Sequence, residues 1–287
     1  MSGTPPAESV LGSPVRRRVG LGGGAARVEL ADGRTVLVKQ GVPTAVAAEA
    51  AGLRWLWVPD GPPVPAVLDE QPGLLITEFV PAAEPEPAAA AELGRRLTGL
   101  HAAGAPAFGA GPPGGPPQAW IGQAPMRNVP TSDRDDSAWA AWYAADRLLP
   151  YLRQARDTGD LTGAQAGSVD RVCDRLPSLA GPPEPPARLH GDLWSGNVLW
   201  SGAGAWVVDP AAHGGHRETD LAMLELFGCP HLATIRAAYD EAAPLADGWR
   251  SRVPLHQLFP LLVHVVLFGR GYAERTTAAA RAALRAG

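Results

Sequence analysis

The sequence is poor in lysine and asparagine. Its 287 residues include 25 lysine and arginine residues, of which one is lysine, at position 39, and it has two asparagines, Asn128 and Asn197. Arginine therefore fills almost every position where any cation is sufficient. A lysine is a compact point charge on a slender stem, which a guanidinium does not replace. The single lysine thus favours a specific role for Lys39.

Cysteine and long apolar runs are also scarce. The two cysteines, Cys173 and Cys229, do not have the spacing of a metal site, and we expect them to be buried, inert thiols. The longest apolar run, near residues 255–268, is interrupted by Pro260 and falls short of the roughly 20 residues that span a bilayer. We interpret it as a buried helix. The first 18 residues lack the apolar stretch of a secretory signal. These absences predict a cytoplasmic protein without a membrane partner.

Several function classes lack their signatures. The formal net charge is −4, and Arg16 to Arg18 form the largest basic block, so nucleic acid is not expected as a partner. The sequence contains no G-x-x-x-x-G-K-[ST], no G-x-S-x-G and no H-E-x-x-H motif. Walker-type nucleotide hydrolysis, α/β-hydrolase chemistry and a helical zinc site are therefore not indicated.

The order of predicted elements indicates an α+β protein with two lobes. Residues 27–39 read RVELADGRTVLVK, which predicts a hairpin around Asp32-Gly33 that ends on Lys39. A glycine cluster precedes it at residues 20–24. The next segments predict a helix over 43–57, a strand over 74–79, helices over 86–101, 138–156 and 169–179, a hairpin joining 198–200 to 206–208, and mostly helix from 219 onward. This pattern predicts a small β-sheet lobe over residues 1–79 and a larger, mostly helical lobe over 80–287.

The clearest chemical signal lies in the second half. Residues 189–197 read LHGDLWSGN and residues 206–210 read WVVDP. Phosphoryl transfer needs a carboxylate that orients the acceptor hydroxyl and takes its proton, which fits Asp192. It also needs oxygen ligands for Mg²⁺, which fits Asn197 and Asp209. An isolated Gly-Asp pair is usually a turn, so Asp192 is a candidate base only together with Asn197 and Asp209.

The first half supplies residues suited to holding ATP. Lys39 can anchor the α- and β-phosphates, and Glu49, on the following helix, can form its ion pair. The glycines, Gly22 and Gly23 among them, would let backbone amides approach the phosphates. Taken singly, these features are common. Their order along the chain predicts a phosphotransferase that uses ATP and Mg²⁺.

The chain resembles the fructosamine/ketosamine kinase family, within the wider group of aminoglycoside- and choline-kinase-like phosphotransferases. The resemblance is carried by HGDLWSGN (190–197), by HRETDLAM (216–223) and by weaker matches such as Trp120-Ile121-Gly122, and it spans nearly the whole chain. It implies a protein-kinase-like fold and phosphorylation of a ketoamine, at the 3-hydroxyl of its sugar. It also implies that a bacterial relative favours ribulosamine- or erythrulosamine-type adducts. The amine would belong to a small molecule or to a protein.

The resemblance also implies roles for single residues. The backbone from Glu78 to Val80 would meet the adenine where the lobes join, and Asp220 would brace the catalytic loop. Trp194 would stack on the sugar or pack beneath the loop. His216, Arg217 and Glu218 would contact the acceptor or order the loop. The sequence departs from the family in a short loop over 19–27 and in Ala-Ala-His-Gly-Gly at 211–215.

Two alternatives stay open at this point. An acceptor such as an aminoglycoside or choline would need several acids, and Asp133, Asp135, Asp136 and Glu218 are available. A nucleotide-binding pseudokinase is the non-enzymatic alternative, and the short glycine loop is the feature that favours it. The sequence leaves the oligomeric state open.

Overall fold

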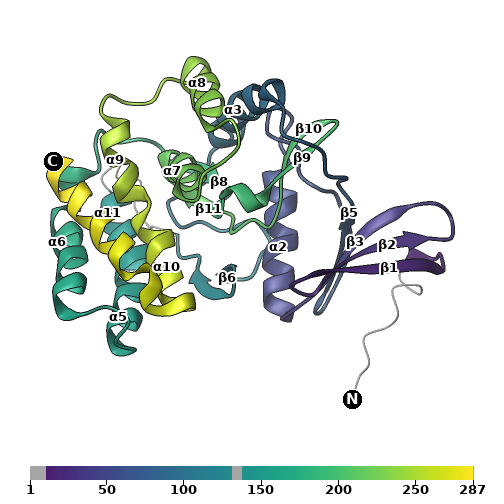
Figure 1. Ribbon diagram of the computed structural model, residues 1–287, viewed down its shortest axis with the longest axis horizontal. Helices are drawn as coiled ribbons and strands as arrows, with labels where there is room; N and C mark the ends of the chain where they lie inside the picture. The colour runs from purple at the N-terminus through teal and green to yellow at the C-terminus, as the bar shows by residue number, and fades with distance from the viewer. Residues whose placement is uncertain (1–10, 131–137, 287) are drawn as a thin grey trace.

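The computed structural model describes residues 11–130 and 138–286, which form a small sheet region and a larger helical region (Figure 1). The strands are β1 (Val15–Gly22), β2 (Ala25–Leu30), β3 (Thr35–Gln40), β4 (Val67–Gln71), β5 (Leu74–Glu78), β6 (Gln118–Ile121), β7 (Ala124–Arg127), β8 (Ala187–Leu189), β9 (Val198–Ser201), β10 (Gly204–Val207) and β11 (His213–Gly215). The helices are α2 (Pro43–Leu56), α3 (Pro87–Ala102), α4 (Ala138–Trp142), α5 (Leu149–Asp157), α6 (Gly163–Leu179), α7 (Glu218–Leu226), α8 (Leu232–Ala242), α9 (Trp249–His256), α10 (Leu258–Phe268) and α11 (Ala273–Ala286). Three shorter helical turns are η1 (Tyr143–Leu148), η2 (Ser195–Asn197) and η3 (Gly269–Tyr272).

The sheet is five-stranded and antiparallel, in the order β1-β2-β3-β5-β4. Alternation on the central strands buries one face, where Val28 and Val38 pack with Ile76 in a cluster of their own. The hairpin around Asp32-Gly33 is as predicted, and Gly33 takes φ +90° in its turn. The two edge strands β1 and β4 were not predicted. Most residues of β1 are exposed and most residues of β4 are partly buried. Neither strand therefore alternates between buried and exposed side chains, which is the pattern that identifies a strand with one buried face.

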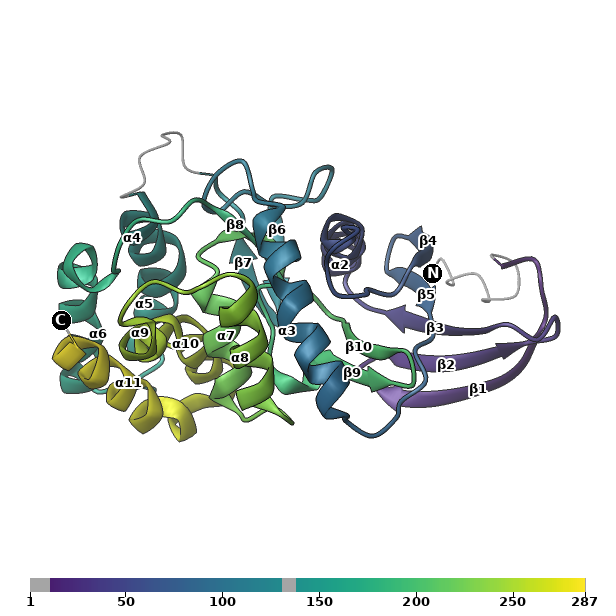
Figure 2. The same ribbon diagram turned by 90° about the horizontal axis from the view of Figure 1, so that it is seen from above.

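Helix α2 lies between the sheet and the helical region (Figure 1). Its residues Val46, Ala50 and Leu53 are buried and pack in one cluster with Leu75 of β5. That cluster continues into α3, α7 and α8, and Figure 2 shows α3 running along the middle of the molecule between the sheet and α7. Glu49 is therefore carried on a helix whose position is fixed from both sides.

The helical region has a second core, to which the apolar C-terminal segments contribute heavily. Residues Trp249–Ala286 have the length and composition of a membrane span, but 56% of the apolar window is buried within the protein. The predicted buried helix over 255–268 is interrupted at Gln257, so α10 starts afresh at Leu258. Seven of the eleven residues of α10 are buried, which accounts for the low polarity of this segment.

The predicted helix over 169–179 begins earlier, at Gly163. Thr162 and Gln165 form a capping box at its start, a T-x-x-Q signal that is visible in the sequence. The hairpin of β9 and β10 is as predicted. The short pairs β6–β7 and β8–β11 were not predicted, because strands of three or four residues beside Gly/Pro-rich segments give little periodic signal.

Candidate active site

The segment 190–197 is a loop that leaves β8 and enters η2 and β9. Its backbone is held by Asp220 of α7, whose carboxylate accepts hydrogen bonds from the backbone N–H of His190 (2.8 Å) and of Gly191 (2.9 Å). His101 of α3 lies 3.2 Å from the same carboxylate. Two helices therefore fix the loop, and Asp220 has the bracing position that the resemblance implies.

Gly191 is required by this geometry. It takes φ +82°, and a Cβ at this position would lie 2.1 Å from the carbonyl oxygen of Ala211. Both the positive φ and the contact exclude an L side chain. The loop and the segment after Asp209 can therefore approach closely, which brings Asp192 beside the predicted metal ligands.

Asp192, Asn197 and Asp209 meet at the end of β10. The amide Nδ2 of Asn197 lies 2.8 Å from the backbone oxygen of Asp192, 3.2 Å from its Oδ2 and 3.4 Å from the backbone oxygen of Asp209. Asp209 has φ +56°, a conformation that is uncommon for residues other than glycine. Such backbone strain is typical of functional sites.

Lys39 reaches the same place from the sheet. Its Nζ lies 2.7 Å from Oε1 of Glu49 and also contacts the carboxylate of Asp209, which is 170 residues away in the chain. Burial lowers the pKa of Lys39, but the charges of Glu49 and Asp209 together outweigh it, so the net pKa is raised. The lysine is therefore charged at neutral pH, as a phosphate anchor must be.

Glu49, Asp192 and Asp209 line a cleft of about 180 Å³, and Lys39 and Asn197 contact these lining residues. Its lining comprises Ala45, Ala48, Glu49, Trp120, Gly122, Asp192, Asp209 and Pro210. Burial raises the pKa of Asp192 to about 7, the hydrogen bond from Asn197 opposes the shift, and the charges of Asp209 and Asp220 add to it. A carboxylate with a pKa near neutrality is well matched to accepting a proton from a hydroxyl group.

The donor set fits the predicted metal. The three contacts of Nδ2 orient the Asn197 amide, and among the described residues its Oδ1 has no hydrogen-bond donor. The Asp209 side chain is 50% exposed and faces the cleft. One carboxylate and one amide oxygen, completed by phosphate and water, suit Mg²⁺.

The predicted nucleotide contacts lie on the sheet side. Gly22 and Gly23 take φ +92° and +57° at the turn between β1 and β2, and a Cβ on either would meet nothing within 4 Å. Gly24 differs, since its Cβ would lie 2.4 Å from the carbonyl oxygen of Gln40. Glu78 ends β5, and Val80, which is 9% exposed, follows in the link toward α3. Contact of these residues with ATP stays a prediction.

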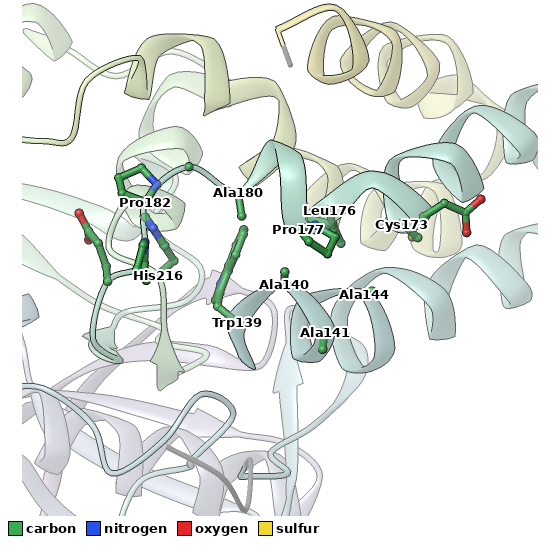
Figure 3. Close-up of a pocket in the computed structure, with 14 residues that line it drawn as sticks. Trp139, Ala140, Ala141, Ala144, Cys173, Leu176, Pro177, Ala180, Pro182 and His216 are labelled. Carbon is green, nitrogen blue, oxygen red and sulfur yellow. The ribbon is translucent and has the colours of Figure 1, made fainter. Parts of the chain in front are cut away.

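None of the four predicted substrate residues lines the cleft. Arg217 donates to Glu184 (2.7 and 2.8 Å), and Glu218 accepts two hydrogen bonds from Arg252 (2.5 and 2.9 Å). His216 instead lines a separate cavity of about 670 Å³, beside Trp139, with 5.0 Å between the two ring centroids (Figure 3). This placement favours loop-ordering roles over acceptor contacts.

Trp194 is placed differently. Its side chain remains 38% exposed beside the catalytic loop, with its ring edge against Phe227 at 6.1 Å between centroids. Both packing beneath the loop and contact with a sugar stay predictions for this residue. Asp133, Asp135 and Asp136 lie outside the described residues.

The sequence motifs alone did not point to Trp120 and Gly122 as part of the cleft. Both lie on the β6–β7 hairpin, which packs against α2 and so closes the side of the cleft facing away from the sheet. The signal was present in the sequence, because Trp120-Ile121-Gly122 is one of the segments that resemble the ketosamine kinases.

Buried histidines around the site predict acid sensitivity. Burial, assisted by the charge of Arg147, lowers the pKa of His213 to about 3. Because the folded pKa is below the unfolded value of about 6.5, the unfolded chain binds the extra proton, and stability falls as the pH drops below 6.5. Between pH 6 and 5, His213→Asn is expected to reduce that loss of stability by about 1.2 kcal/mol.

Urea unfolding at several pH values measures this difference, since asparagine can still donate to the Ala211 carbonyl that His213 contacts at 2.8 Å. His231→Asn is the matched control, because His231 is exposed and its φ of +55° suits asparagine. Parallel pH profiles for His213→Asn and the parent protein would contradict the prediction.

This chain is similar to known proteins in both sequence and fold. The family model described as fructosamine kinase matches residues 29–286. A probable ketoamine kinase from Enterococcus faecium is 33% identical over 186 residues, which cover 64% of this chain and 63% of that protein. A chloroplastic protein-ribulosamine 3-kinase from Arabidopsis thaliana is 35% identical over 184 residues, which cover 63% of this chain and 53% of that protein. The matches thus span between half and two-thirds of the lengths of these two relatives.

A solved structure from Thermobifida fusca, proposed to be a fructosamine-3-kinase, is 47% identical with a TM-score of 0.90, over 99% of this chain and 100% of that one. A more distant structure, the complex of gentamicin with APH(2″)-IIa, covers 99% of this chain and 97% of that one, with a TM-score of 0.58 at 11% identity, and so shows the fold alone. The predicted protein-kinase-like fold is confirmed. The chain belongs to the fructosamine kinase family.

Proposed function

We propose that this protein transfers the γ-phosphoryl group of ATP to a sugar hydroxyl of a ketoamine, the 3-hydroxyl of a ribulosamine- or fructosamine-type adduct. The observation that carries the proposal is the meeting of Lys39, Asp192, Asn197 and Asp209 at one cleft, from segments up to 170 residues apart. Names of relatives support the acceptor class, because they include a ketoamine kinase and a protein-ribulosamine 3-kinase.

Each residue has a separate part in this proposal. Lys39, kept charged and positioned by Glu49, anchors the phosphates of ATP. Asp192 orients the acceptor hydroxyl and accepts its proton as the oxygen attacks the γ-phosphorus. Asn197 and Asp209 would hold Mg²⁺, which neutralises charge on the phosphates when bound. The backbone at Gly22, Gly23 and from Glu78 to Val80 would contact ATP.

Other acceptors are less well supported. An aminoglycoside or choline would need exposed acids, and Glu218 is removed from that set by its buried ion pair with Arg252. The intact set of Lys39, Asp192, Asn197 and Asp209 argues against a pseudokinase. We place the protein in the cytoplasm, where ATP and glycated small molecules or proteins are available as substrates.

Coupled ADP release tests the proposal. The assay compares a ribulose–lysine adduct, a fructose–lysine adduct and free ribulose, each with Mg-ATP. Turnover of the ribulose adduct in excess of the other two is the expected result. ATP binding without turnover of either adduct would contradict the assigned acceptor, and other hydroxyl acceptors would then be tested.

A further inference from the structure

A chain of buried polar side chains continues from the catalytic loop into the helices behind it. His101 of α3 lies between two partners, with its Nε2 3.2 Å from Oδ2 of Asp220 and its Nδ1 2.8 Å from the hydroxyl oxygen of Tyr239. All three side chains are buried. Because Asp220 holds the catalytic loop and Tyr239 belongs to α8, His101 connects that loop to α8.

The contact between His101 and Tyr239 depends on a close approach of two helices. Helices α3 and α8 lie side by side (Figure 2). A Cβ on Gly94 of α3 would lie 2.2 Å from the carbonyl oxygen of Ile235 of α8, so this approach requires glycine. His101 follows Gly94 by about two helical turns and Tyr239 follows Ile235 by about one, so both residues remain on the facing sides of their helices.

The two partners of His101 determine which of its nitrogens carries a proton. Burial would raise the pKa of Asp220, but its interactions with His101 and with the catalytic loop outweigh burial, so the net pKa is lowered and the side chain is a carboxylate. A carboxylate can only accept hydrogen bonds, so Nε2 of His101 must be a donor. Burial raises the pKa of the Tyr239 hydroxyl, which therefore keeps its proton and can donate it to Nδ1 of the neutral ring.

The carboxylate at the end of this chain sets the position of the catalytic loop. Oδ2 of Asp220 accepts from the backbone N–H of His190, and Oδ1 accepts from that of Gly191, the residue before Asp192. Without the donor on His101, Oδ2 of Asp220 loses one of its two partners, and the carboxylate is less firmly oriented. A displacement of the loop by about 1 Å is enough to cost up to about a hundredfold in rate.

We propose that His101 is a positioning residue for phosphoryl transfer, which holds Asp192 in place through Asp220, and that Tyr239 selects the tautomer of His101 that does so. Neither His101 nor Tyr239 lines the cleft, so both act through other residues. The kinetic part of this inference rests on the proposed function. The effect of His101 on the loop can be measured without turnover.

Two substitutions of His101 separate its two contacts. The amide N–H of glutamine can lie near the position of Nε2, so His101→Gln keeps a donor for Asp220. Asparagine is shorter, so His101→Asn keeps a polar group beside Tyr239 and loses the contact with Asp220. With the ribulose–lysine adduct, kcat should fall at least about tenfold in His101→Asn and stay within about threefold in His101→Gln. The affinity for ATP should stay within about twofold of the parent value in both variants.

Tyr239→Phe tests the role of the tautomer, because it removes the hydroxyl alone. We expect kcat to fall about fivefold, the equivalent of one hydrogen bond. Tyr143→Phe is the matched control, since Tyr143 is also buried and its hydroxyl donates to the Leu255 carbonyl at 3.1 Å, away from the catalytic loop. It should leave kcat within about twofold.

Amide hydrogen exchange, followed by NMR, reports on the loop itself. The backbone N–H groups of His190 and Gly191 should exchange at least about tenfold faster in His101→Asn than in the parent protein, and His101→Gln should keep most of their protection. A double substitution adds a second readout. In the Asp192→Asn background, His101→Asn should lower kcat by less than about twofold more, because the position of the lost base no longer matters.

The outcomes separate the two proposals. Equal losses of kcat in His101→Asn and His101→Gln, full additivity with Asp192→Asn, or unchanged exchange at Gly191 would overturn the positioning role. If His101→Asn does not fold, equal kcat values for Tyr239→Phe and Tyr143→Phe would overturn it instead. Failure of the parent protein to phosphorylate the adduct would overturn the proposed function, and the exchange rates would still decide whether His101 holds the loop.

Discussion

Asp192→Asn is expected to lower kcat for phosphoryl transfer by about two to four orders of magnitude, the usual contribution of a positioned general base. Asparagine retains the shape of the side chain and can still accept the hydrogen bond that Asn197 Nδ2 makes at 3.2 Å. What it loses is the capacity to take the proton of the acceptor hydroxyl. Because this capacity is used in the transition state, the affinity for ATP should stay within about twofold of the parent value.

Steady-state kinetics and equilibrium binding of ATP measure the two quantities separately. Asp157→Asn, at an exposed position on α5, is the matched control and should change neither kcat nor ATP affinity. A variant at Asp192 that loses ATP affinity in proportion to its activity would contradict the role of general base. It would indicate instead that Asp192 mainly maintains the site.

Lys39→Arg should also be damaging, although it keeps the charge. The ammonium of Lys39 contacts both Glu49 and Asp209 from a side chain that is 18% exposed. A guanidinium is larger than an ammonium group and planar, and its N–H donors point in fixed directions. It therefore cannot take the same position between two carboxylates. We expect kcat/KM for ATP to fall about a hundredfold, the size of effect that misplacement by an ångström can produce.

The converse exchange at a surface ion pair provides the control. Arg54 lies 2.6 Å from Glu70 with its side chain 54% exposed, and Arg54→Lys should leave kcat/KM within about twofold. Near-normal kcat/KM in Lys39→Arg would remove the argument that the single lysine has been retained for a role that arginine cannot fill.

The parts of the site with short-range signals could be predicted from the sequence. Alternating apolar residues around Asp32-Gly33 predict the hairpin that ends on Lys39. The chemistry of phosphoryl transfer predicts the roles of Asp192, Asn197 and Asp209. The convergence of these residues on one cleft depends on tertiary packing. The sequence could only indicate it through the family resemblance.

The parts that were missed depend on long-range packing. The cleft wall formed by Trp120 and Gly122 comes from a hairpin with four-residue strands, which give almost no periodic signal. Glu218 is an acid near the catalytic residues in sequence, and the resemblance implied that it contacts the acceptor or orders the loop. Its partner Arg252 is 34 residues away, and no sequence motif indicates that ion pair.

Locating the transferred phosphate on the product distinguishes transfer to the 3-hydroxyl from other reactions. The ribulose–lysine adduct would be incubated with Mg-ATP and the purified protein, and the product analysed by ³¹P and ¹³C NMR. We predict a phosphate ester on the 3-hydroxyl of the sugar with the parent protein and almost none with Asp192→Asn. An unmodified adduct in the presence of bound ATP would contradict the proposed reaction, and a phosphate ester that forms equally well with Asp192→Asn would contradict the role of Asp192.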